Sequence, residues 1–566
     1  MSEPRLQGVE ALQKHTMKTS SVVFMLYCLV AAGAFGIEEM ISTSGPGLTL
    51  LMLILFPIFW ALPISEIVSE LGAVLPSEGG AYVWAKEGLG EFWGWQVGFW
   101  GTFGTWLSQA TYVVLVVGYL GKFIDMSPVG AMCVKVGMIL IFTIINLLGI
   151  EEVSTVSTIL SICVMIGFAA VCVVGFMNWN YNPIDPFMSS EEGVVGSLGG
   201  SVCVAIWMYC GYECMSNTAG EIKNPEVIPK GLIICMPLIA LSYFLPTLAG
   251  LASVGQWESW GVEENCVGYM DVLATYAGPA AGIAFLVVAI ISQCSIFNAY
   301  VLSGSRGFFA MADDHLFPLF LCRVSKKRGI PHVSIIVMAC VTMLTCQLNF
   351  ETLVMATTPL MLYLYMSLAI AIVRLRKVYP VEERKEKGVY TIPLGKAGLT
   401  FCTVLPFVIS MIALYVNGTE YFLSGYILLA LSLVLYLICK WVYGGLAKND
   451  PEHFPINPKT KLAKGDISHI GIYLSACGVA ALLGRVLLNW YEGDWGAEYY
   501  LEEYETGLFS NFDLMLQIIL IVGIVCLVLG AVFMAYGFKN DPVQPLVKNE
   551  HVYDYLEEDY YVLEEN

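Results

Sequence analysis

The chain consists mostly of long apolar stretches separated by short polar segments. A helix needs about 20 apolar residues to cross the hydrocarbon core of a bilayer. Windows of that length predict fourteen membrane-spanning helices. Their predicted positions are 20–43, 47–74, 92–120, 130–149, 153–177, 198–221, 231–255, 277–304, 331–349, 352–374, 398–417, 422–444, 469–490 and 513–537.

Apolar and aromatic residues run all round these segments instead of alternating along them. A helix that is apolar on every face meets lipid or another helix. The strands of a membrane barrel would alternate between apolar and polar positions, and these segments do not. The pattern therefore predicts an all-α polytopic membrane protein.

Glycines and carboxylates interrupt two of the predicted spans near their centres. Gly36 and Glu38 lie in the first span, and Gly211 and Glu213 repeat the same Gly-x-Glu spacing in the sixth, 175 residues later. A charge at the bilayer centre costs about 2.5–3.5 kcal/mol, so it is expected only where it faces protein, water or a ligand. Paired, Gly-interrupted segments in two halves of a chain indicate a transporter's binding site.

A broken helix leaves backbone N–H and C=O groups free to hold an ion or a zwitterion. Glycine suits the break because it has no Cβ and lets a ligand approach the backbone. Glu38 and Glu213 each follow a break, and no Lys, Arg or His lies at the middle of spans 1–10. A cationic ligand would supply the missing positive charge. Gly33 is a further candidate for the site, whereas Glu39 is expected at the outer interface as a solvated carboxylate.

The composition agrees with a membrane protein. Hydrophobic residues make up 57% of the 566 residues, charged residues 13%, and the mean hydropathy is +0.70, whereas an ordinary globular chain is about 45–50% apolar. The polar N-terminus leads directly into a long apolar stretch, so we expect no cleaved signal peptide. The 17 cysteines lie mostly inside apolar stretches and imply no disulfide framework.

The positions of Lys and Arg predict the orientation, because cytoplasmic loops retain positive charge. With the N-terminus inside, all but three of the 28 basic residues fall on the cytoplasmic side. The exceptions are Lys122, Lys135 and Arg485. We therefore expect both termini in the cytoplasm and the protein in the plasma or cell membrane.

The predicted external loops are almost purely acidic. A negative mouth would concentrate cations, but acidic loops also arise when topology simply excludes positive charge. The C-terminal tail is acidic as well and is expected to be disordered or to bind a partner. The loop acids are Asp185, Glu191, Glu192, Glu258, Glu263, Glu264, Asp271, Glu492, Asp494, Glu498, Glu502, Glu503 and Glu505, and those of the tail are Glu557, Glu558, Asp559, Glu564 and Glu565.

Three motifs follow predicted spans on the cytoplasmic side. They are Pro-Ser-Glu-Gly-Gly-Ala-Tyr at 76–82, Lys-Asn-Pro at 223–225, and Ser305-Arg306 followed by Met-Ala-Asp at 311–313. In this order they resemble the amino acid, polyamine and organocation transporter superfamily over about residues 20–440. The resemblance implies a five-plus-five inverted repeat in which the first helix of each half is broken.

The resemblance also implies a division of the chain. The expected segments are a cytoplasmic N-terminus 1–19, a first repeat 20–177, an inverted second repeat 198–374, two further spans 398–444, a cytoplasmic loop 445–468, two last spans 469–537 and an acidic cytoplasmic tail 538–566.

Two closer resemblances suggest site residues. The segment Ala-Ala-Gly-Ala-Phe-Gly-Ile-Glu at 31–38 looks like the Gly-Gly-Pro-Phe-Gly-Val-Glu of plant polyamine-uptake permeases. Trp207 and Glu213 have the six-residue separation found in the bacterial arginine:agmatine antiporter, where the Trp is a gate and the Glu is linked to pH response. By the same resemblance, Glu213 is the proton-coupling candidate. The substrate-binding candidates are Gly33, Phe35, Gly36, Glu38, Gln109, Trp207, Gly211, Tyr212, Glu213 and Tyr300.

Aromatic residues of the sixth span offer a way to hold an ammonium group. Trp207, Tyr209 and Tyr212 would form a cage by cation–π attraction, which is worth about 2 kcal/mol when the cation is desolvated. Ordinary packing is the alternative role for each of these rings.

These observations favour a secondary transporter of amino acids or polyamines, with cationic amines or basic amino acids ahead of neutral ones. Uniport, proton symport and exchange of metabolites all remain open. The alternatives are a neutral amino acid permease and a nutrient receptor of the same fold that binds without transporting. The expected partners are the small-molecule substrate and the lipid bilayer, with no nucleic acid, metal or cofactor, and no enzyme activity.

Overall fold

The computed structural model describes residues 7–121, 124–189, 193–261, 266–546, 548–549 and 552–556. Over these residues the regular structure is helical, with only isolated β-bridges. The α-helices are α1 Thr19–Val30, α2 Ile37–Ser44, α3 Pro46–Phe56, α4 Leu62–Val74, α5 Ala81–Leu89, α6 Glu91–Gly121, α7 Pro128–Asn146, α8 Ile150–Met177, α9 Gly193–Met208, α10 Val227–Ser253, α11 Tyr269–Ala277, α12 Pro279–Asp313, α13 His332–Thr345, α14 Phe350–Val378, α15 Val381–Glu386, α16 Gly395–Val416, α17 Thr419–Tyr443, α18 Asp466–Glu492, α19 Gly496–Tyr504 and α20 Phe512–Asn540. The short helices are η1 Val9–Ala11, η2 Pro57–Ala61, η3 Cys214–Glu221, η4 Trp257–Ser259, η5 Leu319–Cys322, η6 Leu446–Lys448 and η7 Asp554–Leu556.

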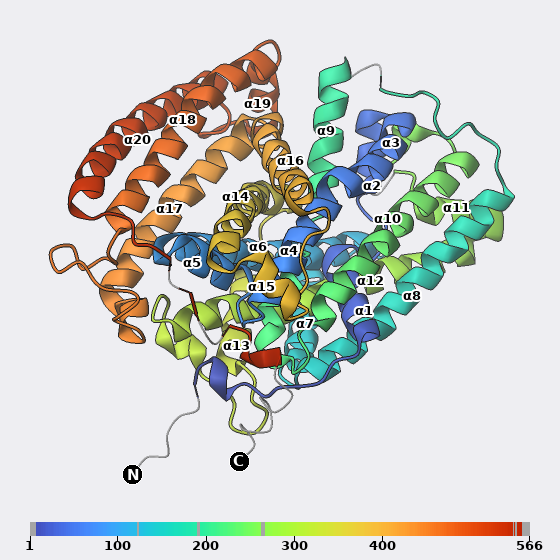
Figure 1. Ribbon diagram of the computed structural model, residues 1–566. Coiled ribbons are helices and arrows are strands. Elements are labelled where there is room, and N and C mark those ends of the chain that lie inside the picture. The colour runs from blue at the N-terminus through green and yellow to red at the C-terminus, as the bar shows by residue number, and fades with distance from the viewer. Residues whose placement is uncertain are drawn as a thin grey trace.

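All fourteen predicted spans fall on helices (Figure 1). In the described residues, eleven helical segments are long and apolar enough to cross a bilayer, among them Pro46–Val74, which joins α3, η2 and α4. Three shorter apolar helices, Thr19–Val30, Ser197–Met208 and His332–Thr345, account for the other predicted spans. The short helices α5, α11, α15 and α19 lie in connections where no span was predicted.

Both predicted breaks are present. Helix α1 ends at Val30 and α2 begins at Ile37, while α9 ends at Met208 and continues after a gap as the 3-10 helix η3. Gly36 has φ +95° and Gly211 has φ +103°, in the left-handed region that only glycine adopts readily. The interruption therefore lies where the glycines allow the chain to leave the helix.

The two broken helices run in opposite directions. The residues just before α1 pair with the end of η3, because the His15 amide donates to the Glu221 carbonyl at 2.8 Å and the Lys223 amide donates to the His15 carbonyl at 2.9 Å. The start of the first broken helix thus meets the end of the second. This antiparallel relation is what an inverted repeat requires.

Residues of the first and third sequence motifs meet Glu221, which lies two residues before the Lys-Asn-Pro motif, in one buried ion cluster at the end of the bundle where η1 lies. Arg306 Nε donates to Glu221 Oε1 at 2.7 Å and lies 3.8 Å from Glu78 Oε1. Glu78 also accepts the Gly220 amide at 3.1 Å. The side chains of Arg306, Glu78 and Glu221 are at most 1% exposed. Burial, followed by the charge of Glu221, raises the pKa of Glu78.

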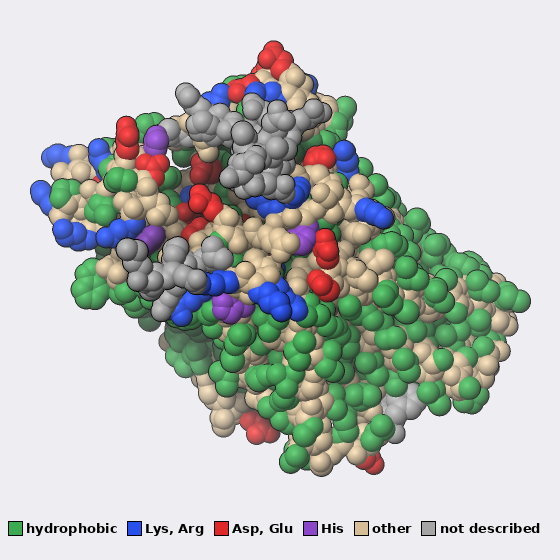
Figure 2. Space-filling view, turned by 90° about the horizontal axis from the view of Figure 1, so that it is seen from below, with side chains coloured by type: hydrophobic (Ala, Val, Ile, Leu, Met, Phe, Trp, Pro, Cys, Tyr) green, Lys and Arg blue, Asp and Glu red, His purple; other side chains and the backbone are tan. Residues whose placement is uncertain are grey.

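A second buried carboxylate at this end is held by two arginines. Glu70 accepts from Arg376 at 2.7 and 2.6 Å and from Arg384 at 2.6 Å, and also from the Ile392 amide at 2.7 Å. Figure 2 shows this end of the molecule: Lys and Arg side chains gather on it, and hydrophobic side chains cover the flank. The basic end and the apolar flank match a protein that spans a membrane.

The described part of the C-terminal tail lies against the same end. The Tyr555 hydroxyl donates to the Ala73 carbonyl at the end of α4, and the Asn549 amide donates to the Tyr379 hydroxyl at 3.1 Å. The expectation of a disordered tail is therefore wrong for these residues. The acidic residues from Glu557 onward lie outside the described residues.

Helices α18 and α20, the last two spans, form a hairpin at the edge of the bundle (Figure 1). Glycines on each helix permit close packing, since a Cβ at Gly471 of α18 would lie 2.5 Å from the Met534 amide nitrogen and one at Gly530 of α20 would lie 2.6 Å from the Ser475 amide nitrogen. Small residues let transmembrane backbones approach closely. The hairpin is thus a tightly joined pair of helices.

The buried ion cluster predicts a large stability effect. Arg306→Met removes one charge and leaves two carboxylates buried, so we expect the free energy of unfolding to fall by about 3–5 kcal/mol. Thermal unfolding in detergent, followed by tryptophan fluorescence, measures it. The matched control is Lys548→Met, whose partner Glu383 and own side chain are 29% and 42% exposed; its loss should stay below about 1 kcal/mol. Equal losses in the two variants would contradict the prediction.

Candidate functional site

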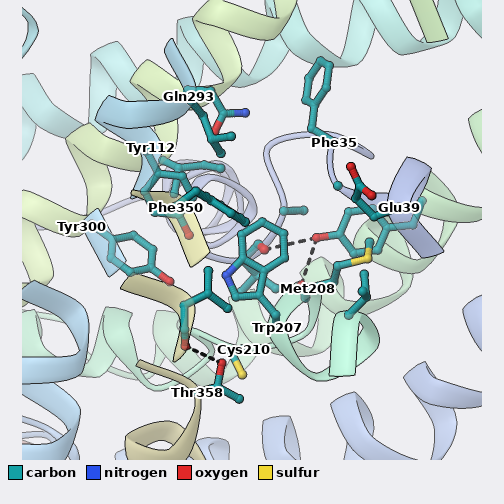
Figure 3. A pocket seen from close by; sticks show the side chains of 18 of the residues that line it. Phe35, Glu39, Tyr112, Trp207, Met208, Cys210, Gln293, Tyr300, Phe350 and Thr358 are labelled. Carbon is teal, nitrogen blue, oxygen red and sulfur yellow. Dashed lines mark hydrogen bonds between the residues drawn. The ribbon is translucent and has the colours of Figure 1, made fainter. Parts of the chain in front are cut away.

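A cavity of about 220 Å³ lies where the two breaks meet (Figure 3). One phenol joins the breaks, because the Tyr243 hydroxyl shares its single proton between the Met208 carbonyl at 3.0 Å and the Val30 carbonyl at 3.2 Å. The cavity is lined by Val30, Ala31, Phe35, Gly36, Glu39, Tyr112, Leu115, Tyr119, Val204, Trp207, Met208, Cys210, Tyr243, Gln293, Ile296, Tyr300, Phe350, Val354, Thr358, Asn417 and Tyr421.

Four of the predicted substrate-binding residues line this cavity: Phe35, Gly36, Trp207 and Tyr300. The Trp207 ring lies at the centre of the view in Figure 3. A Cβ on Gly36 would come within 2.9 Å of Trp207 Cζ3, so only a glycine lets the indole lie against this turn of the first break. The resemblance that singled out Trp207 therefore identified a residue of the cavity wall.

Gly211 and Glu213 lie in a second, much smaller space of about 20 Å³. Trp207 and Tyr300 belong to the walls of both spaces. Glu213 is 3% exposed. Its carboxylate is thus separated from the main cavity by aromatic side chains.

Tyr365 on α14 stabilises the second break. Its hydroxyl accepts the Gly211 amide at 2.9 Å and donates to Glu213 Oε2 at 2.7 Å. A single side chain therefore satisfies a backbone donor released by the break and fixes the carboxylate beside it. Nothing in the sequence links Tyr365 to a residue 152 positions earlier.

Glu38 and Glu39 exchange the roles that the sequence analysis expects for them. Glu38 turns back on its own helix, where Oε2 accepts the Gly36 amide at 2.8 Å, and it is 5% exposed. Glu39 is partly exposed and lines the cavity. Neighbouring residues of a helix point about 100° apart, and of these two only Glu39 belongs to the cavity lining. The helical phase of α2, which the sequence does not fix, selects Glu39.

Besides Glu38, three predicted site residues lie outside the lining of either space. Gln109 is buried and its amide donates to Thr342 on α13. Gly33 serves close packing, since a Cβ there would lie 2.3 Å from Phe168 Cε2. Tyr212 is fully buried. Their role in binding substrate stays a prediction.

The cage of Trp207, Tyr209 and Tyr212 is not formed around the cavity. Tyr209 is fully buried and packs against Phe56 and Tyr243. Residues two positions apart on a helix point about 200° apart, which turns Tyr209 away from the side that Trp207 faces. Rings from other helices surround the cavity instead.

Sequence reasoning missed these other lining residues. Tyr112 and Tyr119 come from α6, Gln293 from α12 and Phe350 from α14. Gln293 is 2% exposed, and its side-chain oxygen has no hydrogen-bond partner among the described residues. Tyr112 and Tyr119 lie seven residues apart, a spacing that places both on one face of α6 and that could have pointed to the cavity.

The cavity carries a negative bias. Helices α1 and α9 both end in its lining, at Val30 and Met208, and a helix C-terminus acts as a partial negative charge of about half a unit. Glu39 is the one charged side chain of the lining. The described residues contain no group of three or more His, Cys, Asp or Glu that could hold a metal ion.

Comparison with known proteins identifies the family. A family model described as amino acid permease matches residues 17–438. The chain belongs to this family. The permease is also 28% identical over 398 residues to a probable polyamine transporter of Arabidopsis thaliana, a match that covers 68% of this chain and 76% of the relative.

Two further relatives are named for different substrates. The polyamine transporter PUT1 of Oryza sativa subsp. japonica is 26% identical over 465 residues, which cover 81% of the permease and 82% of PUT1. The serine/threonine exchanger SteT of Bacillus subtilis is 24% identical over 339 residues, which cover 58% of the permease and 74% of SteT.

A solved structure supports the fold. The crystal structure of MhsT in complex with L-phenylalanine matches with a TM-score of 0.56 at 13% identity, and the match covers 73% of the permease and 99% of MhsT. With the two antiparallel broken helices, this likeness confirms the predicted inverted-repeat transporter fold. The permease is a multi-pass membrane protein of a transporter family.

The two hydrogen bonds of Tyr365 at the second break predict an effect on the free energy of unfolding. Tyr365→Phe leaves the Gly211 amide and the Glu213 carboxylate without this partner, so we expect the free energy of unfolding to fall by about 1–3 kcal/mol. Tyr536→Phe is the control, because Tyr536 is 47% exposed on α20, and it should change stability by less than about 0.5 kcal/mol. Thermal unfolding in detergent compares the two, and the idea fails if Tyr365→Phe behaves like the control.

Proposed function

We propose that the permease carries polyamines or other cationic amines across the cell membrane by alternating access. The observation that carries the proposal is the charge of the cavity lining: one carboxylate, Glu39, two helix C-termini, and no Lys, Arg or His. Such a lining attracts ammonium groups. Two relatives whose names describe polyamine transporters support the same substrate class.

Glu38 argues for amines over amino acids. A broken helix of this fold offers the N-terminus of its second half to an anionic group of the substrate. Here the Glu38 carboxylate already accepts the Gly36 amide at that position. A substrate carboxylate therefore gains less from the first break than it would if this amide were available.

The aromatic lining suits a flexible, cationic chain. Tyr112, Tyr119, Trp207, Tyr300 and Phe350 supply ring faces and apolar surface. An ammonium over such a ring gains about 0.5–2 kcal/mol, and methylene groups between two ammonium groups lose contact with water against the same rings. A diamine or longer polyamine uses both properties at once.

The positions of the cavity and of the buried ion cluster suggest the side from which the substrate enters. The lining extends from the breaks to Asn417 and Tyr421, at the end of α16 opposite the basic end. Toward the basic end lie the small space beside Glu213 and then the buried cluster of Arg306, Glu78 and Glu221. In the proposed cycle the substrate enters from outside, and opening of this cluster releases it.

The positive-inside rule gives the proposed orientation, with both termini in the cytoplasm of a plasma or cell membrane. A negative-inside potential then favours entry of a cation by about 2.3 kcal/mol per charge per 100 mV. Uptake needs no metal ion in this scheme.

Glu213 is the proposed proton carrier. Its carboxylate is buried, lies just beyond Trp207 and is held by Tyr365. A carboxylate in such a place binds a proton most readily when no cation is near, so arrival of an ammonium group in the cavity favours release of that proton. This relation would couple amine movement to proton movement.

The first test is counterflow in proteoliposomes with putrescine, spermidine, arginine, agmatine, leucine and tyrosine. Spermidine and putrescine should be carried, and Glu39→Gln should raise the apparent KM for spermidine about ten- to hundredfold, because a hydrogen bond to a charged group contributes about 1.5–3 kcal/mol. Glu258→Gln is the control, since Glu258 is an exposed acid outside the cavity lining. Transport of leucine and tyrosine alone would overturn the assignment.

The second test concerns Glu213. Glu213→Gln keeps the shape of the side chain and its acceptor for Tyr365 but cannot exchange a proton. We expect uptake by the variant to fall at least tenfold or to lose its dependence on external pH between about pH 5 and 8. Uptake measured against a pH gradient decides this, and an unchanged rate with an unchanged pH profile would reduce Glu213 to a structural carboxyl.

A further inference from the structure

The α18–α20 hairpin reaches back to the substrate cavity through one buried carboxylate. Glu492, the last residue of α18, accepts the Thr419 amide at 3.1 and 3.2 Å, and it also accepts the Thr419 hydroxyl. The Tyr500 hydroxyl of α19 donates to Glu492 Oε1 at 2.9 Å and accepts the Thr419 amide at 3.1 Å. We call Thr419, Glu492 and Tyr500 the corner cluster.

The corner cluster is shielded from water. Glu492 and Thr419 are 0% exposed and Tyr500 is 1% exposed. The expectation that Glu492 is a loop acid of a negative mouth is therefore wrong. Among the described residues, the hydrogen-bond partners of Glu492 are two hydroxyls and a backbone amide, and none is a basic side chain. Burying a carboxylate is costly unless donors satisfy it, so this group is held in a specific place by these contacts.

The cluster fixes the start of α17. Thr419 is the first residue of α17, and its N–H is one of the amides that a helix leaves without an internal partner. A carboxylate there also interacts favourably with the helix dipole. Glu492, which lies 73 residues after Thr419 in the sequence, thus caps the N-terminus of α17.

Gly418 shows how closely the hairpin approaches the corner between α16 and α17. Its φ is +102°, and a Cβ there would lie 3.0 Å from Glu492 Oε1 and 3.1 Å from the Tyr500 hydroxyl. The corner needs glycine both for its backbone conformation and for the space that the cluster occupies.

Two cavity residues flank this corner. Asn417 precedes Gly418, and Tyr421 lies two residues after Thr419; both line the substrate cavity. A rotation of the corner would move both side chains at once. The position of this part of the cavity wall is therefore set by the contact between Thr419 and the hairpin.

The hairpin also contacts the outer half of the second broken helix. A Cβ on Gly199 of α9 would lie 2.7 Å from the Tyr491 hydroxyl of α18 and 2.7 Å from Val416 Cγ1 of α16. Helix α9 ends beside Trp207 in the cavity. One hairpin thus supports two elements of the cavity wall.

We propose that the α18–α20 hairpin is a positioning element of the substrate site, in which Glu492 and Tyr500 hold the α16–α17 corner so that Asn417 and Tyr421 face the cavity. The family model ends at residue 438, before α18 begins, so this element lies outside the part of the chain that defines the family. The test by transport kinetics rests on the proposed function. The test by labelling of residue 417 rests on the geometry of the corner alone.

The transport test uses the full chain in proteoliposomes with spermidine as the probe. Tyr500→Phe removes one donor of the corner cluster and should raise KM about five- to tenfold with kcat changed less than twofold. Glu492→Gln should act in the same direction. Tyr499→Phe and Glu498→Gln are matched controls on α19, where both side chains are exposed, and should leave KM unchanged.

A second background separates positioning from a general loss of folding. In Asn417→Ala/Tyr421→Phe, the side chains that the corner presents are already altered, so adding Tyr500→Phe should raise KM less than twofold further. An equal, multiplicative rise in both backgrounds would overturn the proposal. An unchanged KM in Tyr500→Phe alone, in protein that elutes as a single species, would overturn it as well.

The structural readout needs no substrate. Asn417→Cys is labelled with a membrane-impermeant maleimide, and mass spectrometry of the peptide that contains residue 417 gives the rate. Adding Tyr500→Phe should change this rate at least threefold, whereas adding Tyr499→Phe should not. Equal rates in all three proteins would overturn the proposal. If the permease carries none of the amines tested, the proposed function fails, and the labelling rates still decide the role of the hairpin.

Discussion

The structure depends on how the backbone groups exposed by two broken helices find partners inside the membrane. Each unpaired amide or carbonyl costs several kcal/mol in an apolar environment. Tyr243 shares its hydroxyl proton between the carbonyls of Val30 and Met208, the ends of α1 and α9, and the Tyr365 hydroxyl accepts the Gly211 amide. Tyr243 and Tyr365 lie on α10 and α14, which are continuous helices. These helices therefore supply hydrogen-bond partners for the backbone groups that the breaks expose, and they hold the two breaks beside each other.

The same constraint arranges the charges. A carboxylate that follows each break lies next to a half-helix N-terminus, and it is bound there by the Gly36 amide in one half and by the Tyr365 hydroxyl in the other. With those N-terminal ends bound to carboxylates, the helix ends that line the cavity, those of α1 and α9, are C-termini, which are negative. The cavity between them therefore has a preference for cations before any side chain of its lining is considered.

Outside the cavity, ionic contacts hold the ends of the bundle. At the basic end, Arg306 and Glu78 from two of the motifs and Glu221, just before the third, form a cluster of residues that are far apart in sequence and buried together. At the other end, a carboxylate of the last two spans caps α17 next to the cavity. Ion pairs and capped helix ends are directional, whereas lipid-facing apolar packing is not, so these contacts define the relative positions of the helices.

The sequence by itself determined the fourteen spans and the two breaks, because hydropathy and glycine act over a few neighbouring residues, whereas the inverted relation of the halves was implied by the resemblance to a known family. Gly36, singled out by the break, and Trp207 and Tyr300, singled out by the resemblance, line the cavity. Only the tertiary structure decided that Glu39 faces the cavity while Glu38 caps its own helix, and that Glu492 is buried. Those outcomes depend on the rotation of one helix and on partners many residues away, which local patterns do not encode.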